Sequence, residues 1–192
     1  MAASPTPLES VQACWARISQ GSPIYKLVLS DVIIVSAEKG SMVASLKVTE
    51  NHINSKKGLH GSVSATIVDW AGGMAIAAYS GLEKTGVSTD IHVSYVSSAK
   101  VGDTLTIEAK ASRVGTNMGF TTVTIYKGEG ENKSVVIHGT HSKYILRDRE
   151  ASKSPRSGPC DNTLFSENIQ PRGSITTGFF FASGMTHFHR AL

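Results

Sequence analysis

The stretch that decides the fold runs from Gly61 to Leu82 and reads GSVSATIVDWAGGMAIAAYSGL. Most of its side chains are small or apolar, and Asp69 is its only charged residue. A helix that is apolar all round is normally buried, so we expect a long central helix at roughly 62–82. An ionised carboxylate there costs several kcal/mol unless it is paired or reached by water. We interpret Asp69 as a reactive group; a carboxylate satisfied by backbone and hydroxyl groups is the structural alternative.

Short strands are predicted on both sides of this helix. Residues 25–36 are rich in Val, Ile and Leu and predict one strand, and 42–49 alternate as a second. Further strands are expected at 86–96, 104–114, 119–127 and 133–146, separated by hairpin-length breaks. One apolar helix flanked by antiparallel strands is most simply buried by a sheet that curls around it. The pattern therefore predicts an α+β fold with about six strands.

The two ends of the chain differ from this middle part. Pro5 and Pro7 precede an amphipathic stretch, which predicts a short N-terminal helix within residues 1–20. Residues 147–192 show no sustained period and are rich in Ser, Gly, Thr and Asn, as is typical of a disordered or loosely attached tail. We therefore expect a leading helical segment at 1–20, one domain at 21–146 and a tail at 147–192.

Composition narrows the classes of function. The net charge of +4 is spread without a basic run of five residues, which suits a polyanionic small molecule better than nucleic acid. Two cysteines, Cys14 and Cys160, do not suggest a disulfide framework, and residues 1–20 do not resemble a secretory signal. We expect a reduced, cytoplasmic protein, with a mitochondrial location as the alternative. Asp69 and two adjacent glycines argue against a membrane span.

Five polar or glycine residues around the central helix predict one reactive site: Asn54, His60, Gly61, Asp69 and Ser88. Gly61 opens the helix, where the first amides lack helical partners and the dipole favours negative charge, so its N–H predicts an oxyanion hole. Asp69 lies two turns further on, about 12 Å by helical rise, which is too far to act on the same atom. The chemistry therefore predicts that Asp69 acts with Gly61 of another subunit. Taken singly, each residue except Asp69 is more simply explained as a cap, a turn former or a solvated group.

Three histidines fall in the predicted strands, namely His92, His138 and His141. No Cys or carboxylate cluster joins them at the spacing of metal ligands, so we interpret them as ordinary strand residues. The sequence predicts no metal site and no cofactor.

At this point the chain resembles the hotdog-fold acyl-CoA thioesterases of the PaaI type, and among them the eukaryotic thioesterase superfamily member 2 (acyl-CoA thioesterase 13) group. The resemblance rests on Asn54-x5-His60-Gly61, on Asp69 nine residues after the histidine, and on GVSTDIHVSY at 86–95 followed by SSAKVGD at 97–103. Ser62 stands where the family has a second glycine, and Ser98 where it has a proline.

The resemblance implies a hotdog fold, a homodimer that usually pairs into a tetramer, and metal-free hydrolysis of acyl-CoA to free acid and CoA. Asp69 would be the general base or the nucleophile, and the Gly61 N–H would polarise the thioester carbonyl. His60 and Asn54 would position the substrate, and Ser88 would orient the water. The acyl group is expected to be a medium or long chain, or an aryl group.

The coenzyme A phosphates would need cationic partners, for which Lys56, Lys100 and Arg113 are the candidates. A hotdog protein that binds acyl-CoA without turnover is the main alternative function. A hotdog dehydratase and a purely structural oligomer are the others, and the second leaves Asp69 unexplained.

Overall fold

The computed structural model describes residues 4–81, 84–128 and 130–145. They belong to the first of two compact units, Met1–Ala151, and the tail expected at 147–192 lies outside the described residues. The elements in chain order are α1 (Pro7–Gly21), α2 (Pro23–Leu29), β1 (Ile33–Glu38), β2 (Ser41–Lys47), η1 (Glu50–His52), α3 (Gly61–Ser80), β3 (Val87–Tyr95), β4 (Thr104–Val114), β5 (Met118–Lys127), η2 (Gly130–Asn132) and β6 (Ser134–Tyr144).

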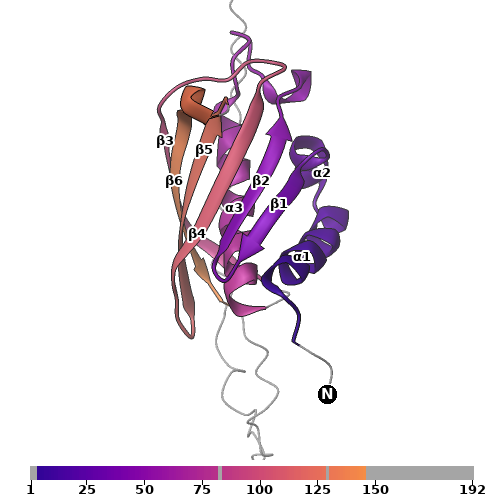
Figure 1. Cartoon of the computed structure of the whole chain (residues 1–192), viewed down its shortest axis with the longest axis vertical. Helices are drawn as coiled ribbons and strands as arrows, with labels where there is room; N and C mark the ends of the chain where they lie inside the picture. The colour runs from indigo at the N-terminus through magenta and orange to yellow at the C-terminus, as the bar shows by residue number, and fades with distance from the viewer. Residues whose placement is uncertain (1–3, 82–83, 129, 146–192) are drawn as a thin grey trace, which may run out of the picture. The chain divides into compact units, whose positions relative to one another are not determined.

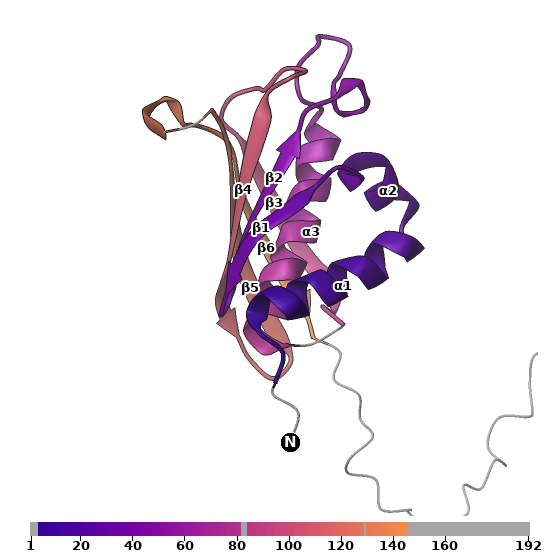
Figure 2. The same ribbon diagram turned by 45° about the vertical axis from the view of Figure 1, so that its right-hand side comes forward.

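The strands form one antiparallel sheet in the order β1-β2-β4-β5-β6-β3. The sheet curves around α3, as Figure 1 shows. In Figure 2 the three helices lie on one side of the sheet. This arrangement confirms the predicted α+β fold with a central helix wrapped by six strands, the hotdog arrangement. Among the described helices, none is long and apolar enough to cross a membrane.

The central helix is buried along most of its length because its faces pack against strands and against α1. His60 caps its N-terminus, and Gly81 ends it in the left-handed conformation at φ 64°. Gly72 allows the helix to approach the sheet closely. A Cβ at this position would lie 2.6 Å from Thr121 Oγ1 and 2.7 Å from His141 Nδ1. The missing side chain therefore sets the distance between α3 and β6.

The strand predicted at 25–36 is wrong in its first half. Residues Pro23–Leu29 form α2, and β1 begins only at Ile33. The Ser22 side chain accepts a hydrogen bond from the Tyr25 amide at 3.4 Å, and Pro23 occupies the first turn, where its missing N–H costs nothing. The aliphatic residues Val28 and Leu29 are buried from a helix rather than from a strand.

The N-terminal helix α1 is joined to the central helix by apolar and aromatic contacts. Thr6 and Glu9 form a capping box at its start. Val11 and Cys14 are buried, and the Trp15 ring meets Trp70 of α3 edge to face, with 5.4 Å between the centroids. The α1 helix therefore packs as part of the core that surrounds α3.

Candidate active site

Asp69 lies near the middle of α3 and faces side chains from three other elements. Its Oδ2 accepts a hydrogen bond from the Tyr25 hydroxyl of α2 at 2.7 Å, and its Oδ1 accepts one from Ser88 of β3 at 2.9 Å. His141 Nε2 and Lys143 Nζ of β6 lie 3.5 and 3.8 Å from Oδ1. The Asp69 side chain is 29% exposed, so this paired carboxylate is also open to solvent or to a ligand.

A β-bulge places Ser88 on the same side of the sheet as Asp69. Ser88 pairs with Lys143 and Ile91 pairs with His141, and the register shifts between Ser88 and Asp90. Without this shift, the alternation of side chains would put Ser88 on the face that carries Asp90. Bulges commonly turn a side chain in this way beside functional sites.

The Ser88 hydroxyl is fully used by its neighbours. It donates its one hydrogen to Asp69, so its two lone pairs accept from His141 Nε2 at 3.0 Å and Lys143 Nζ at 3.2 Å. The hydrogen of the His141 ring is therefore on Nε2. His141 Nδ1 is buried and has no hydrogen-bond partner among the described residues.

The charges of the cluster follow from burial and from these contacts. Burial raises the pKa of Asp69, but the Tyr25 hydrogen bond, the Lys143 charge, the Ser88 hydrogen bond and the nearby His141 together hold that pKa below its ordinary value. Burial, and then Lys143, lower the pKa of His141 to about 4, so the imidazole is neutral at neutral pH. Burial also lowers the pKa of Lys143, against the opposing effect of Asp69. The site thus holds an ionised carboxylate beside a cation and a neutral histidine.

The other predicted site residues lie at the N-terminal end of α3. His60 Nδ1 accepts a hydrogen bond from the Ser62 amide at 3.1 Å, and the Tyr95 hydroxyl donates to the Gly61 carbonyl at 3.1 Å. Asn54 Oδ1 accepts the amides of Lys56 and Gly58 within its own turn. Within one chain, therefore, the structure brings Ser88 to Asp69 and leaves Asn54, His60 and Gly61 at the far end of the helix.

The three candidate phosphate contacts also divide between the two ends. Lys56 and Lys100 are exposed on loops that meet where the Leu59 amide donates to the Ala99 carbonyl, next to the start of α3. Arg113 is exposed near the opposite end of β4.

The interpretation of His141 as an ordinary strand residue is wrong, because its ring lies against Ser88 and Asp69 in a fully buried position. His92 and His138 are exposed, as expected of ordinary strand residues. Tyr25 and Lys143 were missed as well. Their contacts with Asp69 depend on the α2 turn and on the pairing of β3 with β6, neither of which a local pattern reveals. Among the described residues there is no group of three or more His, Cys, Asp or Glu side chains that could hold a metal ion.

Comparison with known proteins places this site in a family. Residues 57–134 match the model of the Thioesterase superfamily. The Schizosaccharomyces pombe protein named "Putative esterase C31F10.02" is 32% identical over 151 residues, which cover 78% of this chain and 89% of that protein. Human acyl-coenzyme A thioesterase 13 is 33% identical over 122 residues, which cover 63% of this chain and 84% of the human protein.

A solved structure agrees with these sequence relatives. The crystal structure of zebra fish thioesterase superfamily member 2 has a TM-score of 0.65 and 33% identity, and the match covers 74% of this chain and all of that one. The mouse structure of the same name has a TM-score of 0.61 and 26% identity, over 75% of this chain and 98% of that one. Fold and relatives thus agree that this chain belongs to the thioesterase superfamily and is a thioester hydrolase.

Proposed function

We propose that the protein hydrolyses acyl-CoA to free acid and CoA without a metal ion, and that Asp69 drives the attack on the thioester. The single observation that carries this proposal is the Asp69 carboxylate, held ionised and still partly exposed between Tyr25 and Ser88. The human relative is named an acyl-coenzyme A thioesterase, which supports acyl-CoA as the substrate class. A medium-chain, long-chain or aryl acyl group remains our expectation, as does a cytoplasmic or mitochondrial location.

In the proposed reaction, water attacks a carbonyl that is polarised at the start of α3. The Gly61 amide has no partner within its own helix and would donate to the developing oxyanion. Asp69 would take the proton from the water, a role commonly worth about 10²–10⁴-fold in rate. Ser88 already donates to Asp69, so in the free protein it fixes the carboxylate. To orient a water as well, Ser88 would have to exchange one of its bonds to His141 or Lys143.

Direct attack by Asp69 is the alternative mechanism, and it passes through an acid anhydride. Hydrolysis in ¹⁸O-labelled water during a single turnover distinguishes the two. A general base leaves the Asp69 carboxyl unlabelled, whereas attack by Asp69 followed by hydrolysis of the anhydride at the Asp69 carbonyl transfers the label to that residue.

We propose further that the site is completed by a second copy of the chain. β3 lies at the end of the sheet and pairs with β6 alone among the described strands. It exposes apolar side chains, including Ile91 and Tyr95. Antiparallel pairing of two β3 strands around Ile91 would bring Tyr95, which contacts Gly61, beside the partner's Ser88, which contacts Asp69. Pairing of such dimers into a tetramer remains an expectation.

The binding of coenzyme A would use cations around the start of α3. Lys56 and Lys100 are exposed on neighbouring loops there, so both can reach a phosphate group placed near Gly61. Arg113 lies near the opposite end of β4 and would contribute only if the partner subunit presents it.

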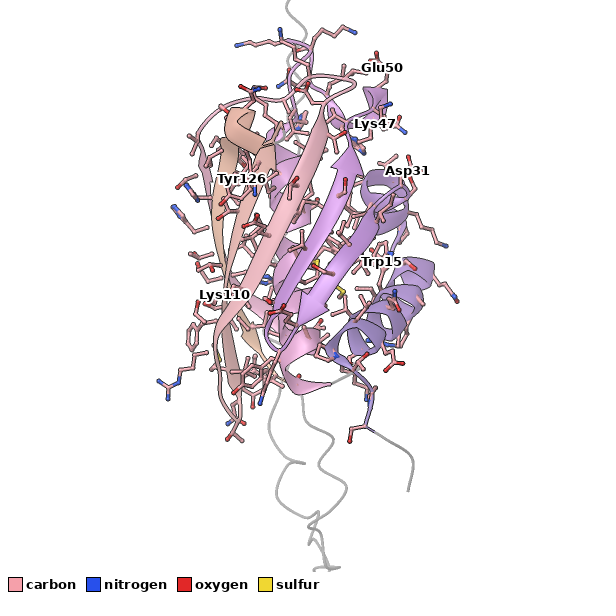
Figure 3. All side chains as sticks on the ribbon, in the orientation of Figure 1. Trp15, Asp31, Lys47, Glu50, Lys110 and Tyr126 are labelled. Carbon is pink, nitrogen blue, oxygen red and sulfur yellow. The ribbon has the colours of Figure 1, made fainter. Side chains whose placement is uncertain are left out.

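The test measures release of CoA thiol from acetyl-, octanoyl-, palmitoyl- and phenylacetyl-CoA by wild type, Asp69→Asn and Asp31→Asn. Asp31 is an exposed aspartate in the turn before β1, far along the chain from the site, and is labelled in Figure 3. We expect turnover by wild type and Asp31→Asn, and a loss of about 100-fold or more in Asp69→Asn. Acyl-CoA binding without turnover in wild type would instead support the non-catalytic alternative.

A further inference from the structure

We propose that Tyr25 is a positioning residue for this reaction: its hydroxyl holds the second carboxylate oxygen of Asp69 and makes the N-terminal helix pair part of the active site. This inference rests on the proposed function of Asp69. It assigns a role to α2, an element that the sequence had not connected with the chemistry.

The two oxygens of Asp69 have different surroundings. Oδ1 accepts from Ser88 and lies near His141 and Lys143, at 3.5 and 3.8 Å. For Oδ2, Tyr25 at 2.7 Å is the hydrogen-bond donor among the described residues. An ionised carboxylate oxygen can accept two hydrogen bonds, so Oδ2 keeps a lone pair for a water or for attack. We therefore assign the reaction to Oδ2.

The Tyr25 bond fixes the direction of that free lone pair. The terminal torsion of an aspartate side chain is broad and poorly restrained by sterics alone. Here Ser88 holds one oxygen from β3 and Tyr25 holds the other from α2, so rotation would break one of these bonds. Such restraint is what a general base or a nucleophile needs to meet a bound carbonyl in the reactive geometry.

The α2 helix is itself anchored at both ends. Ser22 caps its start, and at its end the Val28 carbonyl accepts from His52 Nε2 at 2.9 Å. His52 Nδ1 accepts from the Thr49 amide, so the ring hydrogen is on Nε2. The His52 carbonyl in turn accepts from the His60 amide at 2.8 Å, which links α2 to the N-cap of α3. The backbone that carries Tyr25 is therefore held rigidly relative to α3.

The Tyr25 ring is less firmly packed than its backbone. One neighbour is Trp15 of α1, with 6.1 Å between the ring centroids. The ring also borders a cavity of about 310 Å³ between α1 and α2, whose lining includes Trp15, Ser19 and Lys26. Because part of the ring faces open space, the hydroxyl bond to Asp69 contributes to holding it in place.

The charged and titratable groups around Asp69 come from α1, α2 and β6. They are the Tyr25 hydroxyl, the His141 ring and the Lys143 ammonium, with the Cys14 thiol of α1 close enough to affect Tyr25 and Lys143. Burial and the hydrogen bond to Asp69 raise the pKa of Tyr25, so the hydroxyl remains protonated and donates. In return the hydrogen bond lowers the pKa of Asp69. Removal of the Tyr25 hydroxyl therefore makes Asp69 easier to protonate.

The experiment compares Tyr25→Phe with wild type by measuring kcat and KM for octanoyl-CoA, or for the best substrate, across the acid pH range. Tyr25→Phe keeps the ring that contacts Trp15 and removes only the donor. We expect kcat to fall by about tenfold with little change in KM, and the acid limb of kcat/KM to move up by about one pH unit. Tyr126→Phe is the matched control, because Tyr126 lies on β5, well away from Trp15 in Figure 3.

Two further variants make the outcomes distinct. Tyr25→Leu removes the ring as well, and thermal melting of each variant reports loss of packing. The proposal is overturned if Tyr25→Phe keeps the wild-type kcat and acid limb while Tyr25→Leu is impaired, since the ring then acts only by packing. It is also overturned if KM alone rises, which would make Tyr25 a substrate contact. Absence of turnover by wild type, with Asp69→Asn unchanged, would instead refute the proposed function and with it the basis of this inference.

Discussion

At Gly61 the amide hydrogen and the added bulk of a side chain can be separated by two substitutions. Gly61→Pro removes the N–H at the first helical position, where proline is tolerated, and His60 before it is already extended at φ −72° and ψ 135°. We expect kcat for acyl-CoA hydrolysis to fall by about 10²–10³-fold, because the oxyanion loses a donor.

Gly61→Ala is the matched control for this change. It adds a Cβ, which would lie 3.3 Å from the Tyr95 hydroxyl, but it keeps the amide. Its kcat should stay within about tenfold of wild type. Equal losses in the two variants would show that crowding at Tyr95, rather than the amide hydrogen, accounts for the effect.

His141 makes the stability of the protein depend on pH. Its pKa is lowered from 6.5 to about 4 in the folded chain, so below pH 6.5 the unfolded chain binds the extra proton more readily. The free energy of unfolding should therefore be greatest above pH 6.5 and fall by about 3 kcal/mol as the pH drops toward 4. Urea denaturation at several pH values measures this. His141→Gln should flatten the decline, whereas the exposed His138→Gln should leave it unchanged; an unchanged decline in both would contradict the assignment.

At the residue scale, the sequence predicted the reactive group but not its neighbours. Asp69 stands out because it is the one charge in a helix that must be buried. Tyr25, His141 and Lys143 are 44, 72 and 74 positions away from it along the chain, and nothing in their local patterns marks them. Their roles appear only when the β3–β6 register and the Ser88 bulge are known.

Among the elements, α3 depends most on a missing side chain. A Cβ in Gly72→Ala would come within 2.7 Å of both Thr121 Oγ1 and His141 Nδ1, so α3 would have to move away from the sheet. We expect a loss of about 1–3 kcal/mol in the free energy of unfolding, despite the better helix propensity of alanine, and lower activity because His141 is displaced. Gly21→Ala in α1, whose Cβ would meet nothing within 4 Å, should be neutral or slightly stabilising. Denaturant titration of both variants measures the difference, and equal stability would contradict the close packing.

The one element that the sequence reading mistook is α2. Its residues are aliphatic and aromatic enough to predict a strand, and only Ser22-Pro23 marks a helix start. The central helix and the other strands were predicted within a few residues, because their periodicity is long and their breaks are clear. A seven-residue helix offers two turns of pattern, too few to separate it from a buried strand by composition.

For the whole molecule, the two edges of the sheet make opposite predictions. Ile91→Lys places a charge on the β3 edge, where we propose that two copies pair, and charged edge residues block strand pairing. We expect the dimer to dissociate and activity to be lost. Ile33→Lys on β1, the other edge, changes a residue that is 65% exposed and should leave both unchanged. Light scattering after gel filtration gives the masses, and dissociation by Ile33→Lys instead would place the interface on β1.

The central claim is that Asp69 of one subunit and Gly61 of its partner act on the same thioester. Its most direct test is to mix Asp69→Asn and Gly61→Pro chains, each inactive alone, under conditions that exchange subunits, and to measure CoA release. Half of randomly formed dimers are hybrids, each with one intact site of two, so about a quarter of wild-type activity should return. If the mixture forms hybrid dimers and stays inactive while wild type turns over, both groups belong to one chain and the account of a shared site is wrong.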